Sequence, residues 1–180
     1  EGIEPVDDLD ALELDGLQRY QLLERELDRH PLDGSSPDWM ALHVGQGLLP
    51  AGSGAALEQR HLQERWQSLN QQLRGLGVCR RDVRSMGGRT RPLLFAGDVQ
   101  VVVQAGQLSA AGVMRGWLQH LLLCAEGLTP AGGSAVVARS TRVAGAEVDV
   151  RWSALLTVEA EDQLQQLARL ARQGLERCWP

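Results

Sequence analysis

The sequence predicts an α+β domain in which a central mixed sheet is flanked by helices. Three observations lead to this fold class. Apolar residues recur at helical spacing in the first half of the chain, the pattern changes to period 2 over residues 78–104, and helical spacing returns after residue 109. At 180 residues the chain has the size of a single domain, so one buried core is expected.

An acidic tail and three helices are expected before the sheet. Residues 1–14 carry many acids around few apolar side chains, which is typical of a tail or linker. A first helix is predicted to follow Asp15 as its N-cap, and a short second helix to begin near Ser36 and Pro37. The first helix is expected to bury Leu17, Tyr20, Leu23 and Leu27. A long third helix over 54–76 carries an apolar seam of Leu62, Trp66, Leu69, Leu73 and Leu76.

The second half of the chain predicts the sheet. Strands are expected around 78–85, 91–97 and 98–104, and the last two are joined by a tight turn at "GD". A helix near 109–125, capped by Ser109, has a stripe so wide that we expect it to be largely buried. Its members are Ala110, Val113, Met114, Trp117, Leu118, Leu121, Leu122 and Ala125. Extended stretches "AVVARS" and "AEVDVRWS" and a last helix complete the domain. We divide residues 15–180 into a helical part, 15–77, and a sheet and core-helix part, 78–180.

Composition narrows the function classes. The net charge is -5, and all basic side chains are arginines because lysine is absent, so contact with nucleic acid must be local. Three widely spaced cysteines fit reduced thiols in a cytoplasmic protein better than disulfides or a zinc site. No apolar run is long enough to span a membrane, and the absence of an initiator Met indicates a piece of a longer protein.

A β-hairpin followed by an apolar helix is the layout of many metal-dependent DNA nuclease cores. Such a core needs converging carboxylates for Mg²⁺ and usually a lysine. The hairpin formed by the strands around 91–97 and 98–104 offers only Asp98, which is better explained as a turn residue. The second of these strands carries Gln100 and Gln104 instead of acids. His120 is expected to be a partly packed edge residue, and the Gly-containing loops lack a phosphate-loop pattern. The sequence therefore predicts no catalytic residue, metal site or cofactor.

The segment "CRRDVRSMGGRTR" holds the candidate binding residues. Arg80, Arg81, Arg84, Arg89 and Arg91 lie on two adjacent predicted strands. Period 2 places Arg80 and Arg84 on one face, and the hairpin should bring Arg89 and Arg91 near them. The cluster could be a solvated edge that charge protects from aggregation, or a contact with DNA phosphates or an acidic partner.

Three blocks, "LDGLQRYQLLERELD", "GQGLLPAGSGA" and "MRGWLQHLLLCAEG", resemble the C-terminal region of RecC, the gamma subunit of exodeoxyribonuclease V. The resemblance extends over nearly the whole chain from Leu14. It implies a degenerate restriction-endonuclease-like core, similar to the RecB nuclease, in a subunit that helps to split duplex DNA and guide its strands.

The resemblance also implies partners. These are RecB-like and RecD-like subunits and forked or duplex DNA, with no membrane. ATP hydrolysis and cleavage would then belong to the partner subunits. Two other functions stay open, a divergent active nuclease and a subunit-interaction module without DNA contact.

Overall fold

The computed structural model describes residues 14–29, 39–49, 53–140 and 147–176. The elements are α1 (Gly16–Arg29), α2 (Trp39–Gly45), α3 (Ser53–Leu76), β1 (Cys79–Met86), β2 (Arg89–Ala96), β3 (Val99–Gln107), α4 (Ala110–Ala125), β4 (Ser134–Arg139), β5 (Glu147–Trp152) and α5 (Thr157–Glu176). The predicted α+β class with a mixed sheet between helices is confirmed. The expected tail, except for Leu14, and the expected start of the short helix at Ser36 and Pro37 lie outside the described residues.

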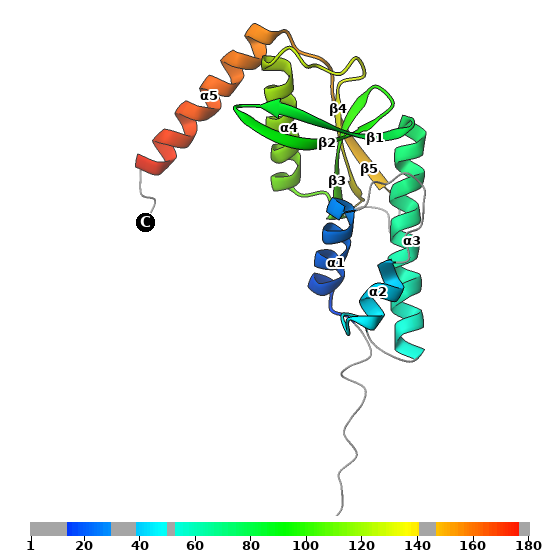
Figure 1. The fold of residues 1–180 in the computed structure, drawn as a ribbon. Helices are drawn as coiled ribbons and strands as arrows, with labels where there is room; N and C mark the ends of the chain where they lie inside the picture. Colours follow the sequence, from blue (N-terminus) through cyan, green and yellow to red (C-terminus); the bar gives the residue numbers. More distant parts are fainter. Residues whose placement is uncertain (1–13, 30–38, 50–52, 141–146, 177–180) are drawn as a thin grey trace, which may run out of the picture.

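The five strands form one sheet in the order β1-β2-β3-β4-β5. Neighbours are antiparallel except β3 and β4, which run parallel and are connected through α4. A parallel pair needs a crossover on one face of the sheet, and α4 supplies it. Helices α1 and α3 cover the opposite face (Figure 1).

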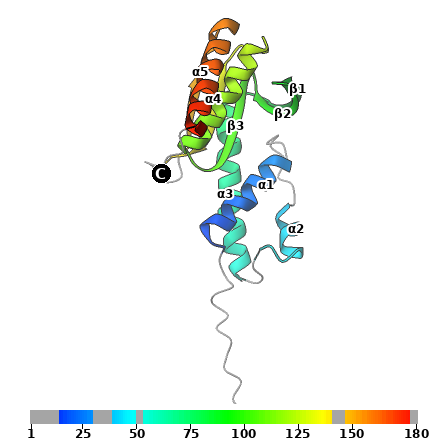
Figure 2. The same cartoon turned by 90° about the vertical axis from the view of Figure 1, so that its left-hand side faces the viewer.

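Helices α1 and α3 hold the largest apolar cluster against the sheet. Leu69 and Leu73 of the predicted seam are completely buried, because the spacing of 4 keeps them on the face toward β3 and β4. Figure 2 shows α1 crossing α3. Asp15 caps α1 as predicted, since its carboxylate accepts a hydrogen bond of 2.7 Å from the backbone N–H of Gln18. The prediction for Leu17 was wrong. Its side chain is 62% exposed, because the buried face of α1 runs through Leu22, Leu23 and Leu27.

Helix α4 packs on the sheet through a face that differs from the predicted apolar stripe. Its buried face contains Gly112, Gly116, His120, Leu123 and Cys124 as well as Leu121. A Cβ atom at Gly116 would stand 2.3 Å from Val136 Cγ2 and 3.0 Å from the Trp152 ring. The stripe prediction was therefore only partly right. Met114 and Leu118 stay 48% and 37% exposed, since the two glycines turn a different face toward the sheet.

A buried polar group lies under α4. His120 is fully buried, and its Nδ1 is 2.9 Å from Ser134 Oγ, while the Cys124 sulfur is 3.6 Å from its Nε2. The ring also stacks against Trp117 and against Trp152, and these two tryptophan rings contact each other. The expectation of a partly packed edge histidine was wrong, because Gly116 brings the helix close enough to bury the ring. Burial lowers the pKa of His120 below its usual 6.5.

Helix α5 begins against α4 and then leads away from the rest of the molecule (Figure 1). Ala160, Leu164 and Leu167 pack on α4, whereas Leu175 near the end of the helix is 82% exposed.

We predict that Gly116→Ala lowers the free energy of unfolding by roughly 1–3 kcal/mol, the usual cost of forcing an extra carbon into a packed core. The matched control is Gly75→Ala, also in a helix, where an added Cβ meets nothing within 4 Å. That change should be neutral or stabilise by up to about 1 kcal/mol. Denaturant unfolding measures both, and equal effects would contradict the close packing.

The second prediction concerns pH. Because burial lowers the pKa of His120, the folded state disfavours its charged form. Its contribution to stability is therefore complete above about pH 6.5 and is lost as pH falls through the lower folded pKa. We expect His120→Asn to weaken the loss of stability between pH 7.5 and 5.5, measured by thermal unfolding. The other ionisable groups are common to both proteins, so identical pH profiles would refute the assignment.

Candidate functional site

The β1–β2 hairpin is the candidate site and forms one edge of the sheet. Its turn is Gly87-Gly88, with φ of 54° and 73°, the left-handed values that a two-residue hairpin turn of this kind requires. The Gly87 amide donates a hydrogen bond of 3.1 Å to Glu126 after α4, which ties the turn to that helix. Strand β2 pairs with β3 only over residues 94–96 and with β1 along its whole length. The hairpin therefore extends beyond the ladder of the central strands.

Four of the five predicted arginines share one face of the hairpin. Arg84 lies directly opposite Arg91, Met86 lies opposite Arg89, and Arg80 lies opposite Phe95. Alternation along both strands then puts Arg80, Arg84, Arg89 and Arg91 on the same side as Met86 and Phe95. The sequence prediction that these charges come together agrees with this register.

Asp82 separates two of these arginines and pairs with both. Its carboxylate is 3.0 Å from Arg84 Nη2 and also accepts a hydrogen bond from Arg80. The hydrogen bond from Arg84, followed by that from Arg80, lowers the pKa of Asp82. Arg80 also lies over the Phe95 ring, with 4.7 Å between its guanidinium carbon and the ring centroid. The sequence already showed an arginine two residues before and two residues after Asp82. The contact between Arg80 and Phe95 could be found only from the strand register.

Arg81 points to the opposite face, away from the other four. Its Nη2 donates a hydrogen bond of 2.6 Å to the backbone carbonyl of Leu27, in the last turn of α1. A cation beside the last carbonyls of a helix satisfies an acceptor that has no partner within the helix. Arg81 thus fastens α1 to the sheet, and the cluster of five separates into four surface residues and one structural residue.

Among the described residues, the acids of β5 do not converge on the turn between β2 and β3 that contains Asp98. Asp98 lies in the turn between β2 and β3, as the sequence predicted. Asp149 pairs in register with Val137, which pairs with Val103, so Asp149 is two strands away and five residues further along. At about 3.3 Å per residue and about 4.8 Å between strands, the two acids are more than about 15 Å apart. Within the described part of the chain, no three His, Cys, Asp or Glu side chains are grouped so that they could hold a metal ion.

The two glutamines of β3 are not placed as metal ligands either. Gln100 is completely buried, and neither of its side-chain polar atoms bonds to any residue that the structure describes. Gln104 donates a hydrogen bond of 3.0 Å to Ser109 Oγ, the N-cap of α4. Both side chains belong to the packing between β3 and α4, because even-numbered residues of β3 face this helix.

The fold and the site define a class: an α+β domain with a five-stranded mixed sheet and an exposed cationic hairpin at its edge. None of the described helices is long and apolar enough to cross a bilayer. A family model for the RecC C-terminal domain matches residues 1–180, and the chain belongs to that family. A search of curated proteins found no match. Membership confirms the resemblance seen in the sequence and implies a role in the RecC subunit of the RecBCD complex, together with other subunits.

Proposed function

We propose that the chain is a non-catalytic, DNA-guiding part of the RecC subunit of exodeoxyribonuclease V. In this role it acts with RecB-like and RecD-like subunits in the cytoplasm, in double-strand break repair and recombination. Residues 15–180 form one unit with a degenerate restriction-endonuclease-like core, preceded by an acidic tail over 1–14. The observation that carries the proposal is the face of the β1–β2 hairpin with four arginines, in a chain of the RecC family.

Charge on this face suits a weak contact with the DNA backbone. Arg89 and Arg91 are exposed, and neither forms an ion pair or side-chain hydrogen bond with another described residue. Arg80 and Arg84 share the single carboxylate of Asp82, so the face keeps a net positive charge. Because the whole chain is anionic, this local field can neutralise only a few phosphates. The hairpin would therefore position DNA without reading its sequence.

The order of elements supports the degenerate nuclease core. Helix α3 is followed by an antiparallel meander of three strands, then α4, then a strand parallel to β3. This arrangement agrees with the hairpin and core helix expected for such a core. Lysine is absent, and no three His, Cys, Asp or Glu side chains of the described residues are grouped so that they could hold a metal ion. A nuclease without convergent carboxylates cannot hold the metal that lowers the pKa of the attacking water.

We predict that Arg89→Gln with Arg91→Gln weakens salt-dependent binding of forked DNA by the assembled complex. Each phosphate contact contributes about 0.9 to the slope of log K against log salt, so the slope should fall by about 1–2 units. The control is Arg169→Gln with Arg172→Gln on α5, which removes the same charge from another exposed surface. Fluorescence anisotropy at several salt concentrations measures both variants.

The same experiment distinguishes the second function. If the hairpin variant and the α5 control leave the slope equally unchanged, the hairpin does not meet DNA. The chain would then act as a subunit-interaction module, and assembly with the partner subunits should become the property that hairpin variants change.

A fourth prediction concerns cleavage. We expect full-length RecC without its partner subunits to leave linear duplex and single-stranded DNA intact in excess Mg²⁺ or Mn²⁺, because the residues that the structure describes contain no group of three side chains that could hold a metal ion. Gel analysis of end-labelled DNA measures the outcome. Metal-dependent degradation that disappears in Asp98→Ala would instead establish a divergent active nuclease.

A further inference from the structure

Helices α4 and α5 form an apolar groove beside the place where α5 leads away from the rest of the molecule (Figure 1). Its volume is about 470 Å³, and its apolar lining consists of Trp117, Leu155, Leu167 and Leu170. Leu170 is 64% exposed, and Met114, one turn before Trp117 on α4, is 48% exposed. Contiguous exposed apolar surface on a folded domain marks a contact with another molecule.

The α4 side of this groove belongs to the wide stripe for which the sequence predicted burial. The sheet covers a different face of α4, and α5 packs on the stripe at Trp117, Leu121 and Ala125. Met114 and Leu118 of the same stripe remain 48% and 37% exposed. A stripe of this width is typical of a helix that is covered on two sides. Within the described structure, one of these coverings is therefore incomplete.

Acidic side chains border the groove, and its described lining contains no basic residue. Glu159 accepts a hydrogen bond of 3.2 Å from the backbone N–H of Leu156, and Asp162 accepts one of 2.7 Å from the Gln166 side chain. Both donors are neutral, so both carboxylates keep their charge. The start of α5 adds about half a positive charge, which offsets only part of it. Arg169, the first arginine of α5, lies about 10 Å along the helix axis from Asp162.

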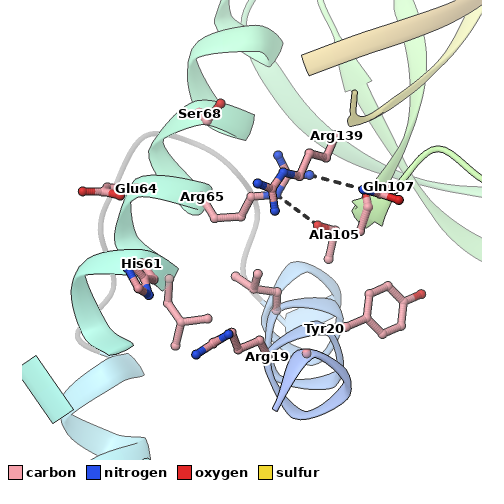
Figure 3. Close-up of a pocket in the computed structure, with 13 residues that line it drawn as sticks. Arg19, Tyr20, His61, Glu64, Arg65, Ser68, Ala105, Gln107 and Arg139 are labelled. Carbon is pink, nitrogen blue, oxygen red and sulfur yellow. Dashed lines mark hydrogen bonds between the residues drawn. The ribbon is translucent and has the colours of Figure 1, made fainter. Parts of the chain in front are cut away.

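The pocket between α1, α3 and the ends of β3 and β4 is larger, at about 620 Å³, but its charges are engaged within the fold. Figure 3 shows the side chains of Arg65 and Arg139 beside each other in this pocket. Arg65 donates a hydrogen bond of 3.0 Å to the carbonyl of Ala105, and Arg19 forms an ion pair with Glu58. By contrast, the carboxylates of the α4–α5 groove form no ion pair with any described residue.

The charge of the groove decides which kind of molecule it can bind. Carboxylates repel DNA, and they also repel the acidic segment over residues 1–14 of the same chain. The complementary partner carries basic side chains beside apolar ones. Met114 with Trp117, and Leu167 with Leu170, are spaced by three residues and form ridges of the kind on which a further helix packs.

We propose that the α4–α5 groove binds an amphipathic helix of a partner subunit, with arginine or lysine beside its apolar stripe. The helix covers the exposed part of the α4 stripe, and its cations lie near Glu159 and Asp162. The proposal rests on membership of the RecC family and not on DNA binding by the hairpin. The two are tested separately, because groove variants change assembly, whereas hairpin variants change the salt dependence of DNA binding.

The first test measures the Kd of assembly between full-length RecC and its purified partner subunits by biolayer interferometry. Asp162→Arg reverses a charge in the groove, and Glu161→Arg makes the same change at an exposed residue outside it. We expect Asp162→Arg to raise the Kd about tenfold, because it places like charges together, and Glu161→Arg to leave it unchanged.

Leu170→Ser tests the apolar part of the contact, with Leu175→Ser as the exposed control outside the groove. The first change should also raise the Kd about tenfold, and the second should have no effect. Thermal unfolding checks that each variant is folded. An unchanged Kd in both groove variants, or equal effects in a variant and its control, overturns the proposal.

A crosslink identifies the bound segment and decides the question if a variant fails to fold. A photoreactive benzophenone side chain at the exposed position Leu170 is incorporated into the assembled complex, and mass spectrometry identifies what it captures. We expect a basic helix of a partner subunit, which the same group at Gln165, exposed outside the groove, does not capture. Capture of RecC itself, from the same or a second copy, or of no protein at all, overturns the proposal.

Discussion

The contact between α4 and β4 is the constraint on which the rest of the fold depends. Strand β4 is covered on both faces, so Val136 and Val137 are completely buried and the strand must lie inside the sheet. Its parallel pairing with β3 requires a crossover, and α4 can serve only if it lies close to the strand. Gly116 allows that distance, because any larger side chain would meet Val136 and the Trp152 ring. The close approach also forces polar side chains such as His120 into the interior.

The β1–β2 hairpin depends little on the packing between α4 and β4, because it lies at the edge of the sheet. This position explains why it carries so many charged residues. Strand β1 has no neighbour on its outer side in the described sheet. The side chain of Val83 in this strand is 68% exposed. An exposed edge strand invites pairing with another chain, which charged side chains oppose. The arginines therefore oppose pairing of this edge with another chain, whether or not they also contact DNA. Asp82 lets them lie close together, since it offsets part of their mutual repulsion.

Arginine has three separate roles in this chain, and the surroundings of each guanidinium decide which role it takes. Arg81 and Arg65 donate to backbone carbonyls and so connect helices to the sheet. Arg19 forms an ion pair with Glu58 and so neutralises a carboxylate that is completely buried. Arg89 and Arg91 project from the hairpin and contribute charge at the surface. A count of basic residues cannot separate these roles, although the total charge of the chain limits what the last group can achieve.

The sequence by itself determined the fold class, the order of elements and the arginine-bearing hairpin. Apolar residues recur at spacings of 3 and 4 between Leu62 and Leu76, and they alternate after Val78. These patterns are local, because the periods of a helix and a strand produce them directly. Only the tertiary structure decided that Arg81 leaves the cluster, that His120 is buried, and that Arg65 and Arg139 share a pocket. Residues 65 and 139 lie on elements that meet through the placement of β4 beside β3. The physical reason is that such contacts depend on strand register and helix distance, which are set by packing between distant segments and leave no periodic trace in the chain.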